Sequence, residues 1–421
     1  MSTNKLYIIL FAYICIIVIQ FTNIKLGPIK IGECTIFLFI LFYALREKTL
    51  YVNNDLKYTF CLITYFLVVS YIVYPFVNYY PPNNIIILKS PALIPLSRYF
   101  QLLLCLSFAY IVFKTLNHRS LPSYNLGVFN KHFFIGNAIL ACIFLLGYLF
   151  EGKLWSEGIF YYNNFRLKGF FNEGGPLGLF YSSIAYYALF HKKYLYTILF
   201  VIIVILAKSK AGIIALILFY LIHMFRHIKN VNSTQFSKKI LKLSLIAILI
   251  FTFSVIGTYC VGKNYYKDYL NIKNEITNRT EDRNLIMGRI AMAYIAPNII
   301  TDHPFLGVGL GNYSNVRNAP KYRKFIPKVD AWDLGGLGGI FKLLVECGII
   351  GVILFFVLCI KLFLFNKIPL TKAVPFISLF LFPFFLGLQL YFFYPWLFLG
   401  LFLHIKHNIN LKPFYFFTKI E

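Results

Sequence analysis

Long uninterrupted apolar runs are the feature that most constrains how this chain can fold. Of its 421 residues, 59% are hydrophobic and 13% are charged, whereas a soluble domain averages about 45–50% apolar and about 25% charged residues. A helix that crosses a bilayer needs about 20 apolar residues, so the runs predict an all-α polytopic membrane bundle of about twelve spans. The expected spans are roughly 6–22, 31–45, 58–75, 98–116, 133–150, 176–190, 194–207, 211–226, 240–260, 338–365, 373–388 and 390–405.

The basic residues of the short loops predict the orientation of the bundle, because Lys and Arg gather on the cytoplasmic side. With the N-terminus inside, basic loops follow every second span, and an even number of spans brings the C-terminus inside as well. We therefore expect nine spans with short loops in 1–260, a large helical loop subdomain outside the membrane in 261–337, and three spans with a cytoplasmic tail in 338–421.

Charge and cysteine content exclude two other classes. A net charge of +26 in a soluble chain would suggest a nucleic-acid partner, but here the charges lie in short loops between apolar runs. We therefore expect no nucleic acid. The eight cysteines are scattered and form no CxxC pair, and neither an Asp-x-Asp pair nor a histidine cluster is present, so we expect no metal and no cofactor.

Two basic segments fall at the outer face, against the charge rule. NNFRLKGFFNEGG (163–175) holds Arg166 and Lys168 among aromatic residues, and Lys208 and Lys210 flank a tight turn between two apolar runs. Both pairs have a plain interpretation, as snorkelling side chains beside an aromatic belt. The alternative is a clamp for an anion such as a lipid pyrophosphate, since basic side chains near apolar helices suggest a functional site.

The outer loop contains a helix followed by glycines at alternating positions. Residues 285–300 show helical periodicity and predict an amphipathic helix at the membrane surface, with Arg289 near its start and His303-Pro304 after its end. Gly307, Gly309 and Gly311 follow. A dinucleotide-binding loop needs GxGxxG after a strand, so this stretch is not a nucleotide site. It is either a turn or a place where the backbone approaches a helix or ligand closely.

Two aspartates, Asp330 and Asp333, precede a glycine cluster that leads into the tenth expected span. One interpretation is an N-cap, because a carboxylate accepts the free N–H groups at a helix start. The other is a general base that takes a proton from a sugar hydroxyl at the outer mouth of the bundle.

Four segments together resemble the O-antigen ligase/polymerase superfamily, whose members are multi-span glycosyltransferases of the GT-C type in the bacterial inner membrane. The strongest is GRIAMAYIAPNIITDHPFLGVGLGNY (288–313), which is similar to the superfamily signature of an arginine, an amphipathic helix and Pro-x-x-Gly-x-Gly-x-Gly. KSKAGIIAL (208–216) resembles its Ser-Arg-Gly/Ala stretch, with Lys210 where Arg is usual. FRLKGFF (165–171) and KLLVECGIIGVILF (342–355) resemble its arginine-glycine loop and its Glu-x-Gly-x-x-Gly helix.

The resemblance implies polymerisation of lipid-linked oligosaccharide repeats in the inner membrane, with both termini cytoplasmic and the large loop periplasmic. Undecaprenyl pyrophosphate would be the leaving group, with no metal or nucleotide, and a chain-length regulator protein would be a possible partner. Arg166, Lys168, Lys210 and Arg289 are the expected pyrophosphate ligands, and Arg289 is also expected to act in catalysis. Asp333, or less favoured Asp330 or Glu173, would be the base.

Two alternatives to a polymerase stay open. Ligases of the superfamily usually carry a His-Asn pair just ahead of the Glu-x-Gly helix, and here that place reads Gly-Leu-Gly-Gly (336–339). This favours a polymerase over a ligase or another transferase of the same architecture. A flippase or transporter of lipid-linked sugars is the third possibility, because intramembrane positive charge suits that function too.

Overall fold

The computed structural model describes most of the chain, and the elements below belong to the described residues. These are 3–26, 29–46, 53–83, 86–117, 122–150, 158, 160–162, 166–228, 270–274, 288–329, 338–364 and 368–411. The long helices are α1 (Thr3–Gln20), α2 (Ile31–Arg46), α3 (Asn54–Val73), α4 (Ile94–Asn117), α5 (Pro122–Phe150), α6 (Gly174–Phe190), α7 (Tyr194–Leu206), α8 (Lys210–Ile228), α12 (Arg289–Asp302), α15 (Gly339–Phe363), α16 (Leu370–Phe385) and α17 (Phe393–Leu411).

Short elements connect these helices. They are the antiparallel pair β1 (Lys25–Leu26) and β2 (Ile29–Lys30), the antiparallel pair β3 (Tyr161–Tyr162) and β4 (Arg166–Leu167), the 3-10 turns η1 (Tyr74–Phe76) and η2 (Ile87–Lys89), and the four-residue helices α13 (Tyr313–Val316) and α14 (Pro320–Arg323).

The described residues are nearly all helical, with two pairs of two-residue strands, which bears out the helical part of the prediction. Each expected span coincides with a helix, except 240–260, which lies outside the described residues. Within the described part, four helices are long and apolar enough to cross a membrane: Asn54–Phe76, Ile94–Asn117, Tyr124–Phe150 and Gly339–Phe363. Five further apolar helices are shorter, from 10 to 17 residues. The count of about twelve spans and the outer loop subdomain stay predictions.

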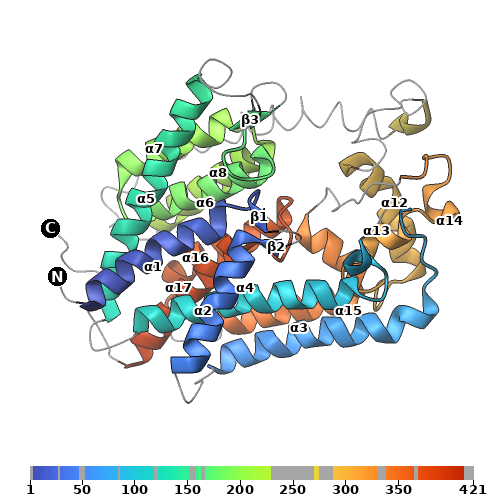
Figure 1. Ribbon diagram of the computed structural model, residues 1–421, viewed down its shortest axis with the longest axis horizontal. Helices are drawn as coiled ribbons and strands as arrows, with labels where there is room; N and C mark the ends of the chain where they lie inside the picture. Colours follow the sequence, from blue (N-terminus) through green and yellow to red (C-terminus); the bar gives the residue numbers. More distant parts are fainter. Residues whose placement is uncertain are drawn as a thin grey trace.

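The helices run up and down, so that ends expected on one side of the membrane meet. At one end, Lys406 of α17 forms an ion pair with Asp55 of α3 at 2.7 Å, and Asn408 of α17 donates to Asn117 of α4. The first turn of α1 and the last turn of α17 lie together at the left of Figure 1. At the other end, the segment 304–313 contacts the end of α3 and the start of α4. We call this second end the mouth of the bundle.

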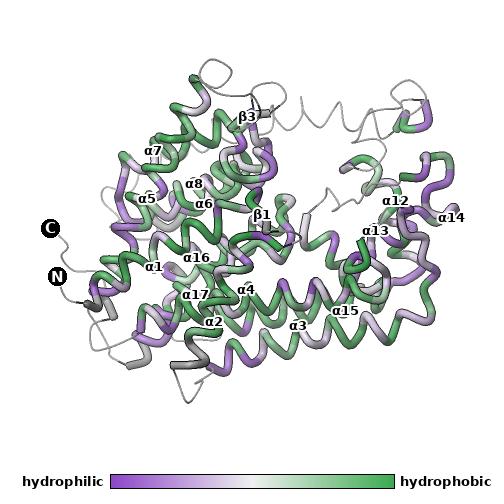
Figure 2. Tube along the Cα trace, viewed as in Figure 1, coloured by the Kyte–Doolittle hydropathy of each residue, from purple (hydrophilic) through white to green (hydrophobic). Residues whose placement is uncertain are grey.

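A second, smaller hydrophobic core lies beside the mouth. The inward side of α12 packs there with Tyr313, Val316, Tyr322 and Ile326, against Val69 and Val73 at the end of α3. The chain around α12 to α14 is more hydrophilic than the bundle helices, as the colours of Figure 2 show. The apolar side of α12, expected to rest on the membrane surface, therefore packs largely against protein.

Small residues bring α6 and α8 into close contact. A side chain at Gly212 of α8 would stand 2.8 Å from the carbonyl carbon of Gly178 of α6. The hydroxyl of Ser182 donates to the carbonyl oxygens of Gly178 and Gly212, at 2.6 and 2.7 Å. Close approach through small residues is typical of membrane helix pairs. It sets the starts of α6 and α8 side by side at the mouth.

Candidate functional site

Helix α15 is broken inside the bundle mouth, at Gly348. This residue has φ 68° and ψ −173°, which interrupts the helix between Cys347 and Ile349. A break leaves backbone N–H and C=O groups without their usual partners, and such groups are costly inside an apolar environment.

The loop after α12 supplies the missing partners. The amides of Val308 and Gly309 donate to the carbonyls of Val345 and Glu346, at 3.1 and 2.8 Å. In the other direction, the amides of Ile349 and Ile350 donate to the carbonyls of Pro304 and Phe305, at 2.9 and 3.2 Å. The loop therefore closes around the break like a clasp, and we refer to residues 304–313 as the glycine clasp.

The three glycines of the clasp are required by its backbone path. Gly307, Gly309 and Gly311 have φ of 69°, 92° and 81°, values that favour glycine. A side chain at Gly307 would stand 2.5 Å from the carbonyl carbon of Glu346, and one at Gly311 would stand 2.7 Å from Ile94. The close-approach interpretation of this sequence is therefore confirmed.

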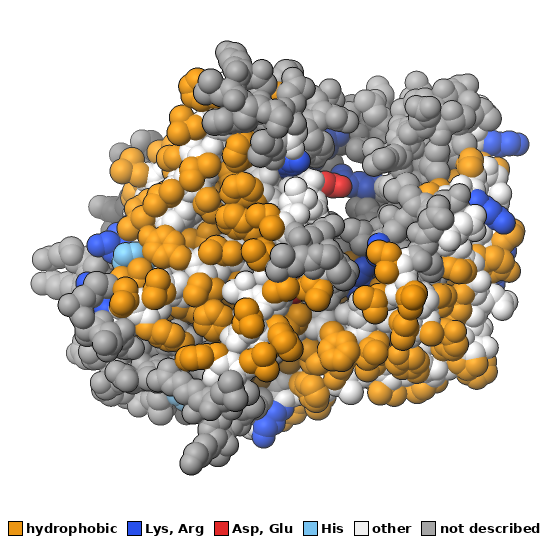
Figure 3. Space-filling model, viewed as in Figure 1, with side chains coloured by type: hydrophobic (Ala, Val, Ile, Leu, Met, Phe, Trp, Pro, Cys, Tyr) orange, Lys and Arg blue, Asp and Glu red, His pale blue; other side chains and the backbone are white. Residues whose placement is uncertain are grey.

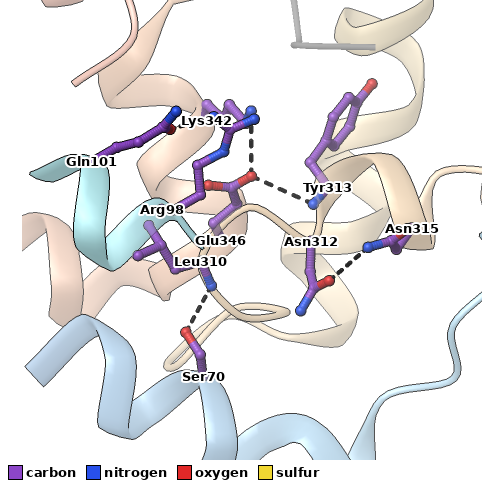
Figure 4. A network of polar contacts seen from close by, with 9 residues as sticks. All are labelled: Ser70, Arg98, Gln101, Leu310, Asn312, Tyr313, Asn315, Lys342 and Glu346. Carbon is purple, nitrogen blue, oxygen red and sulfur yellow. Dashed lines mark hydrogen bonds and ion pairs between the residues drawn. The ribbon is translucent and has the colours of Figure 1, made fainter. Parts of the chain in front are cut away.

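Side chains around the clasp accept hydrogen bonds from two more of its amides. Ser70 of α3 accepts a hydrogen bond from the amide of Leu310 at 2.7 Å, and Glu346 accepts one from the amide of Tyr313 at 3.4 Å. Glu346 also forms an ion pair with Lys342, one turn earlier in α15, at 3.5 Å; both side chains are buried. Figure 4 shows these contacts. Most of the clasp's amides therefore bond to protein, which argues against a phosphate cradle.

A second site forms where α6 and α8 begin. The guanidinium of Arg166, in β4, donates through Nε to the carbonyl of Ala207 at 3.4 Å. Ser209 donates to the carbonyl of Gly175 at 3.3 Å and caps α8 by accepting from the amide of Gly212 at 3.0 Å. These contacts join the arginine-glycine loop to the Lys-Ser-Lys turn.

Four basic residues surround this junction, and we call them the basic turn cluster: Arg166, Lys168, Lys208 and Lys210. Arg166 and Lys168 are half-buried, while Lys208 and Lys210 are exposed. Two helices that start side by side turn the positive ends of their dipoles toward the same place. A basic cluster at such a place favours a phosphate-bearing ligand.

Glu173 lies at the same junction, as the residue before α6. Its side chain is exposed and makes no capping hydrogen bond. The adjacent Gly174 is packed between the backbones of Leu167 and Ala207, with no room for a side chain. Of the expected base candidates, Glu173 is the one among the described residues, since Asp330 and Asp333 lie outside them.

Arg289 is positioned by a different part of the chain. It is the first residue of α12 and is exposed. In Figure 3 the surface is hollowed between the side that carries α6 and α8 and the side that carries α12, and basic and acidic side chains meet in this hollow. The structure thus brings Arg166, Lys168, Lys210 and Glu173 together and sets α12 across from them.

In the outer segment, Asp302 forms an ion pair with Lys321 at 2.7 Å. The hydrogen bond from Lys321 lowers the pKa of Asp302, and partial burial lowers the pKa of the neighbouring His303. Burial therefore favours the neutral form of His303 beside the glycine clasp.

Sequence reasoning assigned no role to Arg98, Lys342 or Glu346. All three are buried, at 8%, 3% and 5% exposure. The available signal was the charge itself, because ionisable residues at apolar helices are rare and usually functional. Arg98 stands at the edge of an expected span and Lys342 and Glu346 stand four residues apart inside another, where they could have been flagged as a pair.

Comparison with known proteins identifies the central part of the chain. A protein-family model described as O-antigen ligase matches residues 195–356. This range begins in α7, contains the Lys-Ser-Lys turn and the glycine clasp, and ends in α15. A search of curated proteins gave no match.

Proposed function

We propose that this chain, whose residues 195–356 match the O-antigen ligase family model, is a membrane glycosyltransferase that polymerises lipid-linked oligosaccharide repeats. The donor is a glycan on undecaprenyl pyrophosphate, and the acceptor is the terminal sugar of an incoming lipid-linked repeat. The observation that carries the proposal is the basic turn cluster at the paired starts of α6 and α8, within the mouth of an apolar bundle.

The reaction exchanges one glycosidic bond for another. The bond between the anomeric carbon and the pyrophosphate oxygen breaks, and a bond from that carbon to an acceptor hydroxyl oxygen forms. The hydroxyl proton passes to a base, and undecaprenyl pyrophosphate leaves with the bonding electrons and one more negative charge. No redox step and no nucleotide enters this balance.

Charge that develops on the leaving pyrophosphate is the main electrostatic demand. Preorganised donors aimed at such charge supply much of an enzyme's rate. Arg166 offers a guanidinium fork that matches phosphate oxygens, Lys168 and Lys210 add point charges, and the α6 and α8 starts add the positive ends of two helix dipoles. Arg289 would approach from α12, across the hollow.

A carboxylate would accept the proton of the acceptor hydroxyl. Asp333 is the preferred candidate, with Asp330 and Glu173 as the others. The exposed position of Glu173 beside the basic turn cluster supports keeping it among them.

A polymerase is favoured over a ligase by the residues just ahead of α15. Gly336, Leu337, Gly338 and Gly339 stand where ligases of the superfamily carry a histidine. Gly338 has a φ of 109°, and an added Cβ would stand 2.9 Å from the carbonyl oxygen of Phe384, so a histidine there would be strained and would lack room.

The proposal is tested with the purified chain in lipid nanodiscs and lipid-linked repeats as the sole substrate. We expect a ladder of polymer and stoichiometric release of undecaprenyl pyrophosphate. Product that forms only after lipid A-core is added would identify a ligase. Movement of the lipid-linked unit across a vesicle without pyrophosphate release would identify a flippase.

Substitutions of Arg289 test whether this residue belongs to the site. Arg289→Ala should abolish the ladder, and Arg289→Lys should restore little, because lysine lacks the guanidinium fork. The exposed position of the side chain predicts unchanged folding in both variants. Normal chain lengths from Arg289→Ala would remove this residue from the site.

A further inference from the structure

Arg98 is held rigidly beside the glycine clasp. Its Nη1 donates to Oε1 of Gln101 at 2.6 Å, and Gln101 in turn donates to Glu33 at 3.0 Å. Its guanidinium lies over the ring of Tyr391, 4.3 Å from the ring centre. Its stem fills the space beside Gly311, where an added side chain would approach Cγ of Arg98 to 2.9 Å.

The charge of this buried arginine is not matched locally. Arg98 is buried, with 8% of its surface exposed. Among the described residues, no carboxylate lies within ion-pair distance of it. Burying a cation without a counter-charge is costly. The arrangement is explained if a ligand supplies the negative charge.

Three hydrogen-bond donors at this place lack an acceptor among the described residues. They are Nε of Arg98, the hydroxyl of Tyr391 and Nζ of Lys342. Lys342 has Glu346 at 3.5 Å as an ion-pair partner, which is too long for a good hydrogen bond. Unsatisfied buried donors are few in native proteins, and each calls for an explanation.

The fold brings these groups to one spot. Gly339, at the start of α15, packs on the backbone of Gln389 and Leu390, directly before Tyr391. Arg98 and Glu346 both border the glycine clasp, through Gly311 and the amide of Tyr313. Figure 4 shows Arg98, Lys342 and Glu346 around the clasp.

We propose that Arg98, Lys342 and Tyr391 form a second anion pocket, which takes the pyrophosphate of a second lipid-linked substrate. The inference rests on the proposed function, because polymerisation joins two substrates that each carry a pyrophosphate. The basic turn cluster serves the headgroup that leaves. The Arg98 pocket serves the headgroup that stays on the product, where no new charge develops and tight, rigid binding suffices.

The test counts headgroups bound by the full chain in nanodiscs, with farnesyl pyrophosphate as the probe. We expect two equivalents per chain, and Arg98→Met should weaken one of them about 10- to 100-fold through loss of charge-assisted hydrogen bonds. Arg166→Ala combined with Lys210→Ala should weaken the other and leave the Arg98 pocket intact. A single equivalent that survives Arg98→Met would overturn the proposal.

Further probes identify the chemistry of the occupant. Farnesol should not bind the pocket, and inorganic pyrophosphate should compete for it more weakly than farnesyl pyrophosphate. Equal affinity for inorganic phosphate and farnesyl pyrophosphate would assign the pocket to a free anion and overturn the assignment to a lipid headgroup.

Thermal stability separates binding from a structural role. Without ligand, Arg98→Met should raise the midpoint of thermal unfolding, since it removes an uncompensated buried charge. Lys406→Met is the matched control and should lower the unfolding midpoint, because it leaves the carboxylate of Asp55 without its ion-pair partner. An Arg98→Met variant that is less stable and still binds two headgroups would show a purely structural arginine.

The outcomes distinguish this inference from the proposed function. Two bound equivalents without any polymer would contradict the polymerase and support the pocket. Polymer formation by an Arg98→Met chain that still binds two equivalents would support the polymerase and contradict the pocket.

Discussion

The glycine clasp and the basic turn cluster differ in how their backbone is used. The clasp has the sequence pattern that suggests a phosphate loop, yet its amides bond to the broken helix α15 and to Ser70 and Glu346. The basic turn cluster has no glycine-rich signature in its Lys-Ser-Lys turn, yet two helices begin there side by side.

The comparison teaches that a glycine pattern reports backbone conformation before it reports chemistry. In the clasp, glycine is needed for positive φ and for the approach of one backbone to another. In the basic turn cluster the chemistry comes from exposed cations and from helix starts. Substitutions in one region should therefore change folding, and substitutions in the other should change transfer.

Of the substitutions that compare these two regions, Arg166→Ala should have the largest effect, and it should act on catalysis. Loss of one preorganised donor typically costs about 10²–10³ in rate, so we expect that decrease in polymer formation. The half-buried side chain donates a long hydrogen bond to the carbonyl of Ala207, so the unfolding midpoint is measured alongside the rate to separate a loss of catalysis from a loss of folding. A rate within a few-fold of wild type would remove Arg166 from the leaving-group site.

Gly348→Ala should have the next largest effect and should act on folding. At φ 68° an alanine is strained, and its Cβ would overlap the carbonyl of Phe305. We expect a loss of about 2–4 kcal/mol, seen as a lower unfolding midpoint and a lower yield of folded protein.

The control for that substitution is Gly127→Ala in α5, where an added Cβ meets no atom within 4 Å. It should be neutral or stabilise the helix by up to about 1 kcal/mol. Equal effects of the two substitutions would mean that the clasp does not depend on the break in α15.

Lys208→Gly should raise the stability of the chain and lower its activity. Lys208 has φ 46°, and relief of this strain should stabilise the chain by up to about 1 kcal/mol. Loss of its charge should slow transfer about five-fold, since two charges 4 Å apart in water interact by about 1 kcal/mol.

Lys192→Gly is the matched control, because Lys192 has φ 58° at the far end of α6. It should gain the same stability and keep full activity. A loss of transfer in Lys192→Gly would show that the effect at Lys208 does not report a local charge.

Asp302→Asn should have the smallest effect. The hydrogen bond from Lys321 lowers the pKa of Asp302, so the ionised form stabilises the fold above the unfolded pKa near 3.9, and that stability is lost as pH falls through the lowered pKa. Because both side chains are largely exposed, the gain is at most about 0.5 kcal/mol.

The measurement is the unfolding midpoint between pH 7 and pH 3. The difference between wild type and Asp302→Asn should be small at pH 7 and should shrink as pH falls below the unfolded pKa of about 3.9. A difference that grows on acidification would contradict the sign of the pKa shift.

Much of the helical architecture could be predicted from the sequence. Expected spans such as 194–207 and 211–226 match α7 and α8 to within a few residues, because apolar runs of that length satisfy their backbone only as helices. The end of α12 at Asp302 also followed from His303-Pro304. The surface position expected for α12 did not anticipate the second core, because periodicity marks an apolar side without saying what covers it.

The candidate site could be predicted only in part. Arg166, Lys168, Lys210 and Glu173 were marked by charge at the outer face, and the structure brings them to one junction. Arg98 escaped notice because its significance depends on Tyr391 and Gly311, which lie hundreds of residues away in the chain.

The sequence by itself determined that this chain forms apolar helices and carries exposed cations in the loops between them, since hydropathy and charge are properties of the residues. Only the tertiary structure decided which glycines clasp a broken helix and which basic residues share a junction. Those outcomes depend on contacts between segments far apart in the chain, and a hydrogen bond between Ser70 and Leu310 leaves no local trace in either stretch.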